Sequence, residues 1–494
     1  MRMKLSTLIR DMHGEAIHRE GDPEIRSVEY DSRKVTKGSL FVAVKGYETD
    51  GHKFIAMALE KGAAAIILED KGALNPGMKQ FQAAFFQVPN SRVALAQASA
   101  AFYGHPADSL TVIGVTGTNG KTSVTHLLKS ILAAAGHKAG VIGTIENQIG
   151  NESFPAQVTT PESKDLQELL WQMIEKGCDY CIMEASSHAL FLDRVHGISF
   201  KGGIFTNLTQ DHLDFHGSME AYLEAKLKLF RGLSKDAFAI INRDDPASDQ
   251  VAAACSCPVM GYSLHAPSEL QGQDLRMSLK GTSYQVETRQ GSLRVKMGLM
   301  GIFSVYNSLA AIGAALALGI SPKAIEVGIA GVKVKGRFEL VESEEEFAVV
   351  VDYAHTPDGL LNVLTSAREI SQGRVLCVFG CGGDRDRTKR PLMGRVAAEC
   401  CDEFIITSDN PRTEEPMSII SMIEAGAREA GGRFQTIENR REAIAAAIAM
   451  AQPGDIVVIA GKGHEDYQIL GREKVHFSDV ETAMEFLERR RREK

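Results

Sequence analysis

The sequence lacks the features that would place it in a membrane or on a nucleic acid. Its longest mostly apolar stretches, residues 309–320 and 443–451, are shorter than the roughly 20 residues that a membrane-spanning helix needs. The first residues contain no continuous apolar segment, so we expect no signal peptide. The formal net charge of −8 disfavours nucleic acids as partners. We expect a cytoplasmic protein without membrane insertion.

Cysteine is also sparse. Eight cysteines in 494 residues do not form the framework of a disulfide-stabilised protein, and their number fits a reducing compartment. Cys178 and Cys181 have the spacing of a metal or redox motif. Their surroundings resemble a buried strand, however, and the pair Cys377 and Cys381 has a different spacing. We therefore expect Cys178 and Cys181 to be core residues.

The length and the alternation of apolar patterns predict an α/β protein of three domains. We place a smaller mixed α/β domain at residues 1–108, a central domain at 109–333 with a mostly parallel P-loop-type sheet, and a Rossmann-like α/β domain at 334–494. In the central domain a period-two pattern near 274–300 indicates antiparallel strands. The expected central strands are 110–115, 139–143 and 179–184, with helices at 121–135, 163–176 and 305–318. The expected third-domain strands are 348–351, 375–379, 404–407 and 456–459, and a capping box at 478–481 starts a terminal helix.

Residues 114–122 read Gly-Val-Thr-Gly-Thr-Asn-Gly-Lys-Thr and lie between an apolar strand pattern and a helical pattern. This order predicts a phosphate cradle, in which backbone N–H groups and a helix N-terminus face the anion. Lys121 would reach the β- and γ-phosphates, and the Thr122 hydroxyl would bind Mg²⁺. The strict P-loop pattern requires glycine where Val115 stands, so an ordinary glycine-rich turn is the alternative. We assign the nucleotide site to Gly117, Thr118, Asn119, Gly120, Lys121, Thr122 and Ser123.

Polar clusters follow several predicted strands, which is where ligands bind in open α/β sheets. Glu184 ends one strand and is suited either to hold Mg²⁺ or to cap a helix. Residues 206–217 contain two aspartates and two histidines within six positions, more than folding requires. Three further clusters rich in arginine and acids, at 380–387, 409–412 and 461–465, favour a zwitterionic substrate.

Taken together, these motifs resemble the Mur ligases, and the resemblance covers essentially the whole chain in the expected order. It is carried by the segments Thr116-Gly-Thr-Asn-Gly-Lys-Thr122, Glu184-Ala-Ser-Ser-His188, Asp211-His-x-Asp-x-His-Gly217, Tyr222-x-x-Ala-Lys226, Gly301-x-Phe303-x-x-x-Asn307, Gly336-Arg337 and Asp352-Tyr-Ala-His-Thr-Pro357. The resemblance implies an enzyme that uses ATP to join a UDP-sugar-peptide to an amino acid in bacterial cell-wall synthesis. The route it implies runs through an acyl phosphate, which the incoming amine attacks.

The resemblance also implies the metal and catalytic residues. Thr122 and Glu184 would hold one Mg²⁺, and His212 with Lys226 would serve a second. Because a lysine ammonium cannot bind a metal, Lys226 would carry CO₂ as a carbamate, as the matching lysine does in this family. The catalytic residues so implied are Lys121, His212, Lys226 and Arg337. The further nucleotide contacts so implied are Asn307, Arg337 and Asp352.

The substrate contacts implied by the resemblance divide into two sets. The UDP-sugar-peptide would meet Ser32, Thr159, Thr160, Ser186 and Arg194. The incoming amino acid, meso-2,6-diaminopimelate, would meet Arg385, Asp409, Asn410, Pro411, Arg412, Gly461 and Glu465. The physics agrees at Arg412, because a guanidinium binds the distal carboxylate of diaminopimelate with two charge-assisted bonds and repels the ammonium of lysine. Glu465 would suit the ammonium.

Three alternatives stay open from the sequence. The same ligase could add L-lysine, or the chain could resemble a folylpolyglutamate synthetase, which would not need the first domain or the Asp409–Arg412 motif. In another class, it could be a P-loop regulator without ligase activity. We expect the protein to be a monomer.

Overall fold

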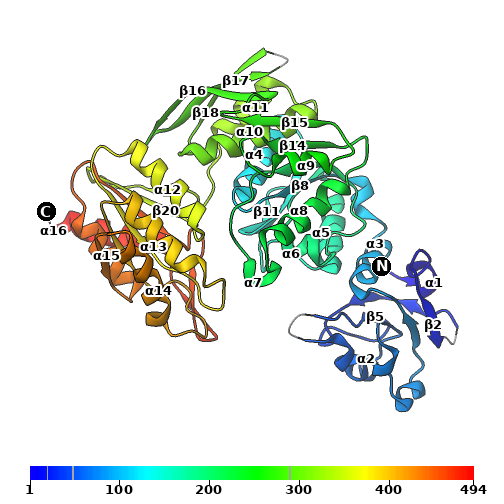
Figure 1. The fold of residues 1–494 in the computed structure, drawn as a ribbon. Coiled ribbons are helices and arrows are strands. Elements are labelled where there is room, and N and C mark those ends of the chain that lie inside the picture. The colour runs from blue at the N-terminus through cyan, green and yellow to red at the C-terminus, as the bar shows by residue number, and fades with distance from the viewer. Residues whose placement is uncertain (19–20, 47–48, 289–290, 494) are drawn as a thin grey trace.

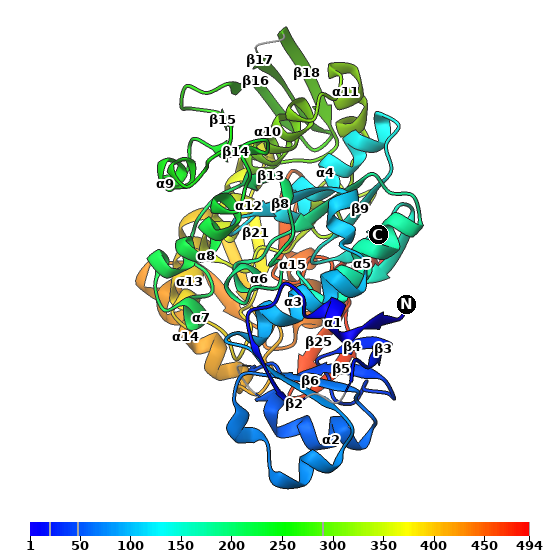
Figure 2. The ribbon, with the colours of Figure 1, turned by 90° about the vertical axis from the view of Figure 1, so that its right-hand side faces the viewer.

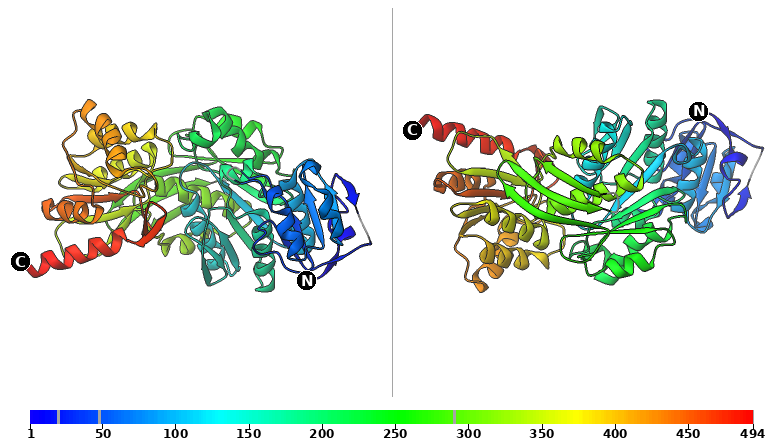
Figure 3. Two further views of the ribbon diagram at one scale, coloured as in Figure 1. Left: turned by 90° about the horizontal axis from the view of Figure 1, so that it is seen from below. Right: turned by 90° about the horizontal axis from the view of Figure 1, so that it is seen from above.

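The computed structural model describes residues 1–18, 21–46, 49–288 and 291–493. It is an α/β structure in which three lobes follow one another in chain order. The N-terminal lobe and the C-terminal lobe lie at opposite ends of the molecule, with the central lobe between them (Figures 1 and 3). The sites that bind different substrates can therefore be distributed along one chain and meet where the lobes adjoin.

The N-terminal lobe contains a mixed five-stranded sheet with helices on both faces. The strand order is β2 (Glu15–His18), β7 (Ala84–Gln87), β6 (Ala65–Leu68), β5 (Ser39–Val42) and β4 (Ser27–Glu29), with only β2 antiparallel to its neighbour among the described strands. One face packs on α1 (Leu5–Leu8) and α3 (Ser91–Phe102), and the other on α2 (Ile55–Glu60). The smaller elements are β1 (Met3–Lys4), β3 (Glu24–Ile25) and the 3₁₀ turns Gly51–Phe54, Lys71–Ala73, Pro76–Gln80 and Pro106–Ser109.

An eleven-stranded sheet forms the central lobe. Its order is β11 (Glu152–Pro155), β10 (Glu146–Ile149), β9 (Ala139–Ile142), β12 (Tyr180–Glu184), β8 (Thr111–Thr116), β13 (Phe200–Phe205), β14 (Phe238–Asn242), β15 (Val259–Ser263), β16 (Leu270–Ser278), β17 (Gly281–Thr288) and β18 (Gly291–Met297). The seven neighbouring strands β9, β12, β8, β13, β14, β15 and β16 run parallel to one another. At one end of the sheet β10 and β11 pair antiparallel, and at the other end β17 and β18 do so. In Figure 2, β16–β18 lie at the end of this lobe farthest from the N-terminal lobe.

Helices cover both faces of the central parallel strands, which explains why these strands are apolar throughout. One face packs on α4 (Lys121–Ala134), α10 (Ile302–Ala317) and α11 (Pro322–Ala330). The opposite face packs on α5 (Ser163–Glu175), α6 (Ser187–Phe191), α8 (Met219–Arg231) and α9 (Ser248–Ala253), and a short helix α7 (Leu213–His216) precedes α8. Because the helices cover the faces of the sheet, the loops that follow the carboxyl ends of β8, β12 and β13 can carry polar residues.

The third lobe has a six-stranded sheet in which only β19 is antiparallel among the described strands. The order is β19 (Glu339–Val341), β20 (Ala348–Asp352), β24 (Ile456–Ala460), β21 (Val375–Phe379), β22 (Glu403–Ile406) and β23 (Phe434–Thr436). On one face lie α12 (Pro357–Ile370), α13 (Lys389–Cys400) and α14 (Pro416–Glu429), and on the other α15 (Arg440–Met450) and α16 (Asp479–Glu493). A separate hairpin joins β25 (Tyr467–Leu470) to β26 (Glu473–His476).

Most sequence-predicted elements are present within one to three residues of their expected bounds, and the predicted fold class is confirmed. The antiparallel strands predicted near 274–300 are confirmed as β16, β17 and β18, which extend one end of the central sheet. The capping box is half formed: Ser478 Oγ accepts from the Glu481 N–H, but the Glu481 carboxylate pairs with His476. Cys178 and Cys181 are buried free thiols, as predicted for core residues. The boundaries at 108 and 333 stay our proposal.

No helix in the described part of the chain combines the length and the apolar character that a membrane crossing requires.

Candidate active site

The loop between β8 and α4 is shaped by two glycines in the left-handed region. Gly117 has φ 151° and Gly120 has φ 89°, conformations that residues with a Cβ rarely adopt. A Cβ on Gly117 would collide with Thr206 Oγ1, and one on Gly120 with Asn307 Oδ1. The loop is therefore packed closely against the end of β13 and against α10, two segments that the sequence places far from it.

The Lys121 ammonium lies at the centre of this loop. It donates to the carbonyl oxygens of Gly117 at 2.9 Å and Thr118 at 2.8 Å, and burial lowers its pKa. A bound phosphate would favour the charged form, because an adjacent negative charge stabilises the ammonium. The loop itself is braced from β13, since Thr206 Oγ1 donates to the Asn119 carbonyl at 2.6 Å.

Glu184 faces the first turn of α4. Its Oε1 accepts from Thr122 Oγ1 at 2.9 Å and from the Thr144 N–H at 2.9 Å, and its Oε2 accepts from Thr144 Oγ1. The carboxylate is fully buried. These bonds join three separate segments, so Glu184 does not act as a helix cap. A hydroxyl and a buried carboxylate at this distance fit the ligand preference of Mg²⁺.

Asp211 and His212 lie where the central and C-terminal lobes adjoin. His212 Nε2 is 3.4 Å from Asp211 Oδ2, and Lys389 Nζ of α13 is 3.8 Å from Asp211 Oδ1. Burial lowers the pKa of His212, so its imidazole is neutral at pH 7, which is the form that binds metals. The His188 ring packs against His212 with centroids 4.7 Å apart.

Lys226 is a fully buried lysine on α8. Its Nζ lies 4.1 Å from the centroid of the Tyr222 ring, whose hydroxyl donates to Thr118 Oγ1 at 3.3 Å. Burial, with a further contribution from the nearby charge of Lys121, lowers the pKa of Lys226 well below its ordinary value. Burial thus favours the neutral amine, which is the form of lysine that can act as a nucleophile.

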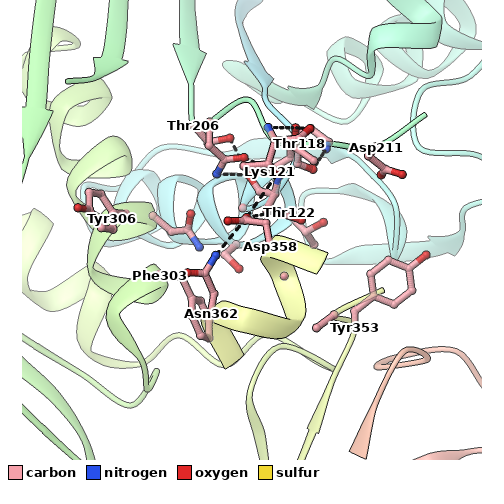
Figure 4. Close-up of a pocket in the computed structure, with 18 of the residues that line it drawn as sticks. Thr118, Lys121, Thr122, Thr206, Asp211, Phe303, Tyr306, Tyr353, Asp358 and Asn362 are labelled. Carbon is pink, nitrogen blue, oxygen red and sulfur yellow. Dashed lines mark hydrogen bonds between the residues drawn. The ribbon is translucent and has the colours of Figure 1, made fainter. Parts of the chain in front are cut away.

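A cavity of about 520 Å³ lies between the central and C-terminal lobes. Figure 4 shows Asp358 and Asn362 on α12 facing Lys121 and Thr122 on α4 across this space. The cavity brings together these sequence-predicted residues: Thr118, Asn119, Gly120, Lys121, Thr122, Ser123, Thr159, Glu184, Ser186, His212, Asn307, Arg337 and Asp352. The predicted residues that do not line it are Ser32, Gly117, Thr160, Arg194, Lys226 and the amino-acid set of the third lobe.

Arg337 and Asp352 connect the third lobe to the nucleotide loop. The Arg337 guanidinium donates to Thr122 Oγ1 at 3.3 Å and lies over the Tyr353 ring. Both oxygens of Asp352 accept backbone N–H groups, from Phe338 at 2.6 Å and Ala354 at 2.7 Å. Asp352 thus holds the loop that presents Arg337.

Sequence reasoning missed several cavity residues, of which Asp358 is the most informative. Its carboxylate accepts from Asn119 Nδ2 at 2.9 Å and from Asn362 Nδ2 at 3.1 Å, and burial raises its pKa. Asp358 lies in the first turn of α12, one residue beyond the Asp352–Pro357 motif. This closeness to the motif was the signal that could have identified it from the sequence. The other missed lining residues include Thr144, Phe303, Tyr306, Tyr353 and Asn362.

The residues predicted for the UDP-sugar-peptide lie on two lobes. Thr160 Oγ1 donates to the Glu184 carbonyl at 2.6 Å, and Arg194 donates to the Thr160 carbonyl at 3.0 Å. Ser32 lies apart in the N-terminal lobe, where its hydroxyl contacts Met57 Sδ at 3.5 Å. The two lobes are joined at Glu162, whose carboxylate pairs both with Arg194 and with Arg92 of the N-terminal lobe.

The sequence-predicted amino-acid residues form a cluster at the carboxyl ends of β21, β22 and β24. Arg412 is held at φ 53° by backbone bonds to the β25–β26 hairpin, and its guanidinium donates to the Gly383 carbonyl at 2.8 Å. Arg385 lies close enough for its charge to help burial lower the pKa of Arg412. The positive charges of Arg385 and Arg412 therefore lie close together, which favours the binding of an anionic group of a ligand.

The acidic part of the same cluster is built around a lysine that sequence reasoning left without a role. Lys462 donates to Asn410 Oδ1 at 3.1 Å and to Glu465 Oε2 at 3.0 Å, and Asn410 Nδ2 donates to the same Glu465 oxygen at 2.9 Å. Gly461, with φ 119°, leaves room for Asp409, because a Cβ there would lie 2.6 Å from Asp409 Oδ2. The signal for Lys462 was its place between two glycines directly after a buried strand.

No group of three or more His, Cys, Asp and Glu side chains in the described ranges is arranged to hold a metal ion. The predicted donors include a threonine hydroxyl and a lysine carbamate, which lie outside that set of residue types.

Three family profiles match the chain in order. They are described as "Mur ligase family, catalytic domain" over residues 24–103, "Mur ligase middle domain" over residues 115–315, and "Mur ligase, glutamate ligase domain" over residues 336–463.

Curated and solved relatives extend over the full length. The chain is 45% identical to the UDP-N-acetylmuramoyl-L-alanyl-D-glutamate--2,6-diaminopimelate ligase of Geobacillus thermodenitrificans, across 99% of this chain and 100% of that protein. A solved structure of a ligase with the same name is 33% identical, covers 99% of this chain and 100% of its own, and superposes with a TM-score of 0.69. A Mycobacterium tuberculosis folylpolyglutamate synthase complexed with ADP and AMPPCP, 20% identical, shares the fold with a TM-score of 0.63 over 75% of this chain and 92% of its own.

Proposed function

The chain belongs to the Mur ligase family, and we propose that it adds meso-2,6-diaminopimelate to UDP-N-acetylmuramoyl-L-alanyl-D-glutamate in peptidoglycan synthesis. It is an ATP-dependent ligase that forms a peptide bond. The observation that carries the substrate assignment is the full-length match to ligases named for these two substrates. The regulator alternative does not agree with this membership, and the folylpolyglutamate synthase resemblance leaves a quarter of the chain uncovered.

The proposed reaction has two steps. ATP transfers its γ-phosphoryl group to the terminal carboxylate of the UDP-dipeptide, giving ADP and an acyl phosphate. The neutral amine of diaminopimelate then attacks the acyl carbon, and phosphate leaves as the amide forms. In the first step Lys121 and Arg337 neutralise charge on the transferring phosphoryl group, since both cations lie at the nucleotide loop. We propose that the C-terminal lobe excludes water from the acyl phosphate.

We propose that Mg²⁺ is bound by Thr122 and Glu184, with a second ion at His212 and the Lys226 carbamate. The first set is supported by the contact between the Thr122 hydroxyl and the buried Glu184 carboxylate. The second is supported by the Tyr222 ring, which lies next to both the His212 ring and Lys226 Nζ, and by the burial that favours a neutral His212 imidazole. When bound, the ions supply positive charge next to the ATP phosphates. The Lys226 carbamate would form when the neutral amine adds to CO₂, making an N–C bond and releasing one proton. The lowered pKa of Lys226, caused by its burial, supports this step because it favours the neutral amine.

The remaining contacts divide between the two substrates. We propose that Ser32 meets the uridine nucleotide, while Thr159, Thr160, Ser186 and Arg194 meet the muramoyl-dipeptide. The linked positions of Arg92, Glu162 and Arg194 support one continuous site across these two lobes. We further propose that the enzyme acts in the cytoplasm as a monomer.

Arg412→Ala should impair the use of diaminopimelate about 30-fold or more in kcat/KM, because a charged group loses its partner in a closed site. The loss should appear mainly in the KM for diaminopimelate, with a small gain for L-lysine, whose ammonium Arg412 repels. The measurement is the ratio of kcat/KM for the two amino acids in wild type and variant.

Arg395→Ala is the matched control, since Arg395 is an arginine of the same lobe that pairs with Glu429 at the surface. It should leave the ratio unchanged. An unchanged ratio in Arg412→Ala would remove Arg412 as the selector while leaving the ligase assignment in place.

A further inference from the structure

Lys462 is a fully buried lysine in the amino-acid cluster, and its burial requires an explanation. Lysine is rarely buried completely unless its charge is paired, because removing an ammonium from water is costly. Here the Nζ has two hydrogen-bond acceptors, Asn410 Oδ1 at 3.1 Å and Glu465 Oε2 at 3.0 Å, and lies 3.9 Å from Asp409 Oδ1. The ammonium is therefore compensated entirely by residues proposed to face the incoming amino acid.

These contacts fix the orientation of the Asn410 amide. An ammonium can only donate, so the side facing Lys462 must be the carbonyl oxygen. That oxygen also accepts from the Ile469 N–H at 3.0 Å, which leaves the amide nitrogen to donate to Glu465 Oε2 at 2.9 Å. Without the lysine, the amide would lose one of the three interactions that distinguish its two ends.

The same contacts determine which oxygen of the Glu465 carboxylate is free to bind a ligand. Its Oε2 receives two donors, from Lys462 and Asn410, so this oxygen is occupied within the protein. In the ranges that the structure describes, the side-chain hydrogen bonds of Glu465 all use Oε2, so Oε1 remains for a ligand ammonium. Lys462 also neutralises charge between Glu465 and Asp409, two carboxylates that would otherwise repel each other.

We propose that Lys462 is a positioning residue for amino-acid selection: it orients Asn410 and Glu465 so that one Glu465 oxygen accepts the ammonium at the distal end of the diamino acid. Lys462 acts through these two residues and does not touch the substrate. The proposal rests on the proposed function, because it needs a diamino acid in this cluster.

The test compares Lys462→Met with Lys474→Met. Both lysines lie over the Tyr467 ring, at 5.5 and 3.5 Å, but Lys474 is exposed. We expect Lys462→Met to raise the KM for diaminopimelate about 10- to 100-fold, while the KM for ATP and for the UDP-dipeptide stays within about twofold. Lys474→Met should behave as wild type. An unchanged KM for diaminopimelate in Lys462→Met would overturn the proposal.

A partial reaction separates positioning from a general structural role. Hydroxylamine at high concentration attacks the acyl phosphate directly, displacing phosphate and giving a hydroxamate without using the amino-acid cluster. Lys462→Met should retain hydroxamate formation close to wild type, and an equal fall in both reactions would overturn the proposal. If wild type itself forms neither hydroxamate nor diaminopimelate product, the proposed function fails instead.

A double-mutant cycle tests whether Lys462 acts through Glu465. Combining Lys462→Met with Glu465→Gln should raise the KM for diaminopimelate no more than the larger single effect, because both remove one interaction. If the double variant instead raises the KM by the product of the two single effects, Lys462 does not act through Glu465 and the proposal is contradicted. Should the methionine variant lose its native melting transition, Lys462→Gln replaces it, with the same KM rise expected.

Discussion

Lys121→Ala should lower kcat about 1,000-fold while leaving the melting temperature close to that of wild type. The ammonium lies at the centre of the nucleotide loop, 2.9 and 2.8 Å from two of its carbonyl oxygens. Removing it takes away the charge that stabilises the transferring phosphoryl group, an effect exerted mainly in the transition state. The measurements are ADP release under saturating substrates and a thermal melt.

Lys129→Ala is the control for this variant, because Lys129 is another partly buried lysine on α4 whose bonds go to Gln148 and Gly150. It should keep most of the activity. Turnover near the wild-type rate in Lys121→Ala would remove the assignment of the nucleotide site to residues 117–123.

Lys226→Ala should lower kcat about 100-fold, because the second metal position loses its anionic support. Lys226→Arg should be equally inactive, since a guanidinium stays positively charged and cannot form a carbamate. If the lysine carries CO₂, small carboxylic acids should partly restore the alanine variant. Because burial lowers the pKa of Lys226 and so favours the neutral amine, the carbamate should be lost as the pH falls and the amine becomes protonated.

A spectroscopic measurement tests for the Lys226 carbamate independently of enzyme activity. Wild type in ¹³C-labelled bicarbonate should show a carbamate carbon signal that is absent from Lys226→Ala and Lys226→Arg. Lys228→Ala, which removes an exposed lysine of the same helix paired with Asp193, should retain both the signal and the activity. Robust activity in Lys226→Arg would contradict the carbamate.

The elements that sequence reasoning predicted are those whose signal is local. The strand, glycine-rich loop and helix around Lys121 could be predicted because apolar periodicity and glycine positions report backbone conformation directly. The polar clusters after β13, β21, β22 and β24 could be placed at one edge of their sheets for the same reason. The capping box at Ser478 was only half informative, because His476 competes for the Glu481 carboxylate.

What could not be predicted depends on contacts between distant segments. Asp358 and Asn119 are separated by 239 residues, and only the packing of α12 against the central lobe brings them together. The burial of Lys226 is likewise a property of the tertiary structure, as is the role of Lys462, which depends on where Asn410 and Glu465 lie. A sequence shows that such residues are present but not which charges face them.

The central claim is tested most directly by the amino acid that the purified enzyme incorporates. The enzyme would be incubated with ATP, Mg²⁺ and UDP-N-acetylmuramoyl-L-alanyl-D-glutamate, together with meso-diaminopimelate, L-lysine or no amino acid, and ADP and amide product would be quantified. We predict one ADP for each amide formed with meso-diaminopimelate, strong discrimination against L-lysine, and little ADP without an amine. Preference for L-lysine would contradict the diaminopimelate assignment, and the absence of product with every amino acid would contradict the ligase function itself.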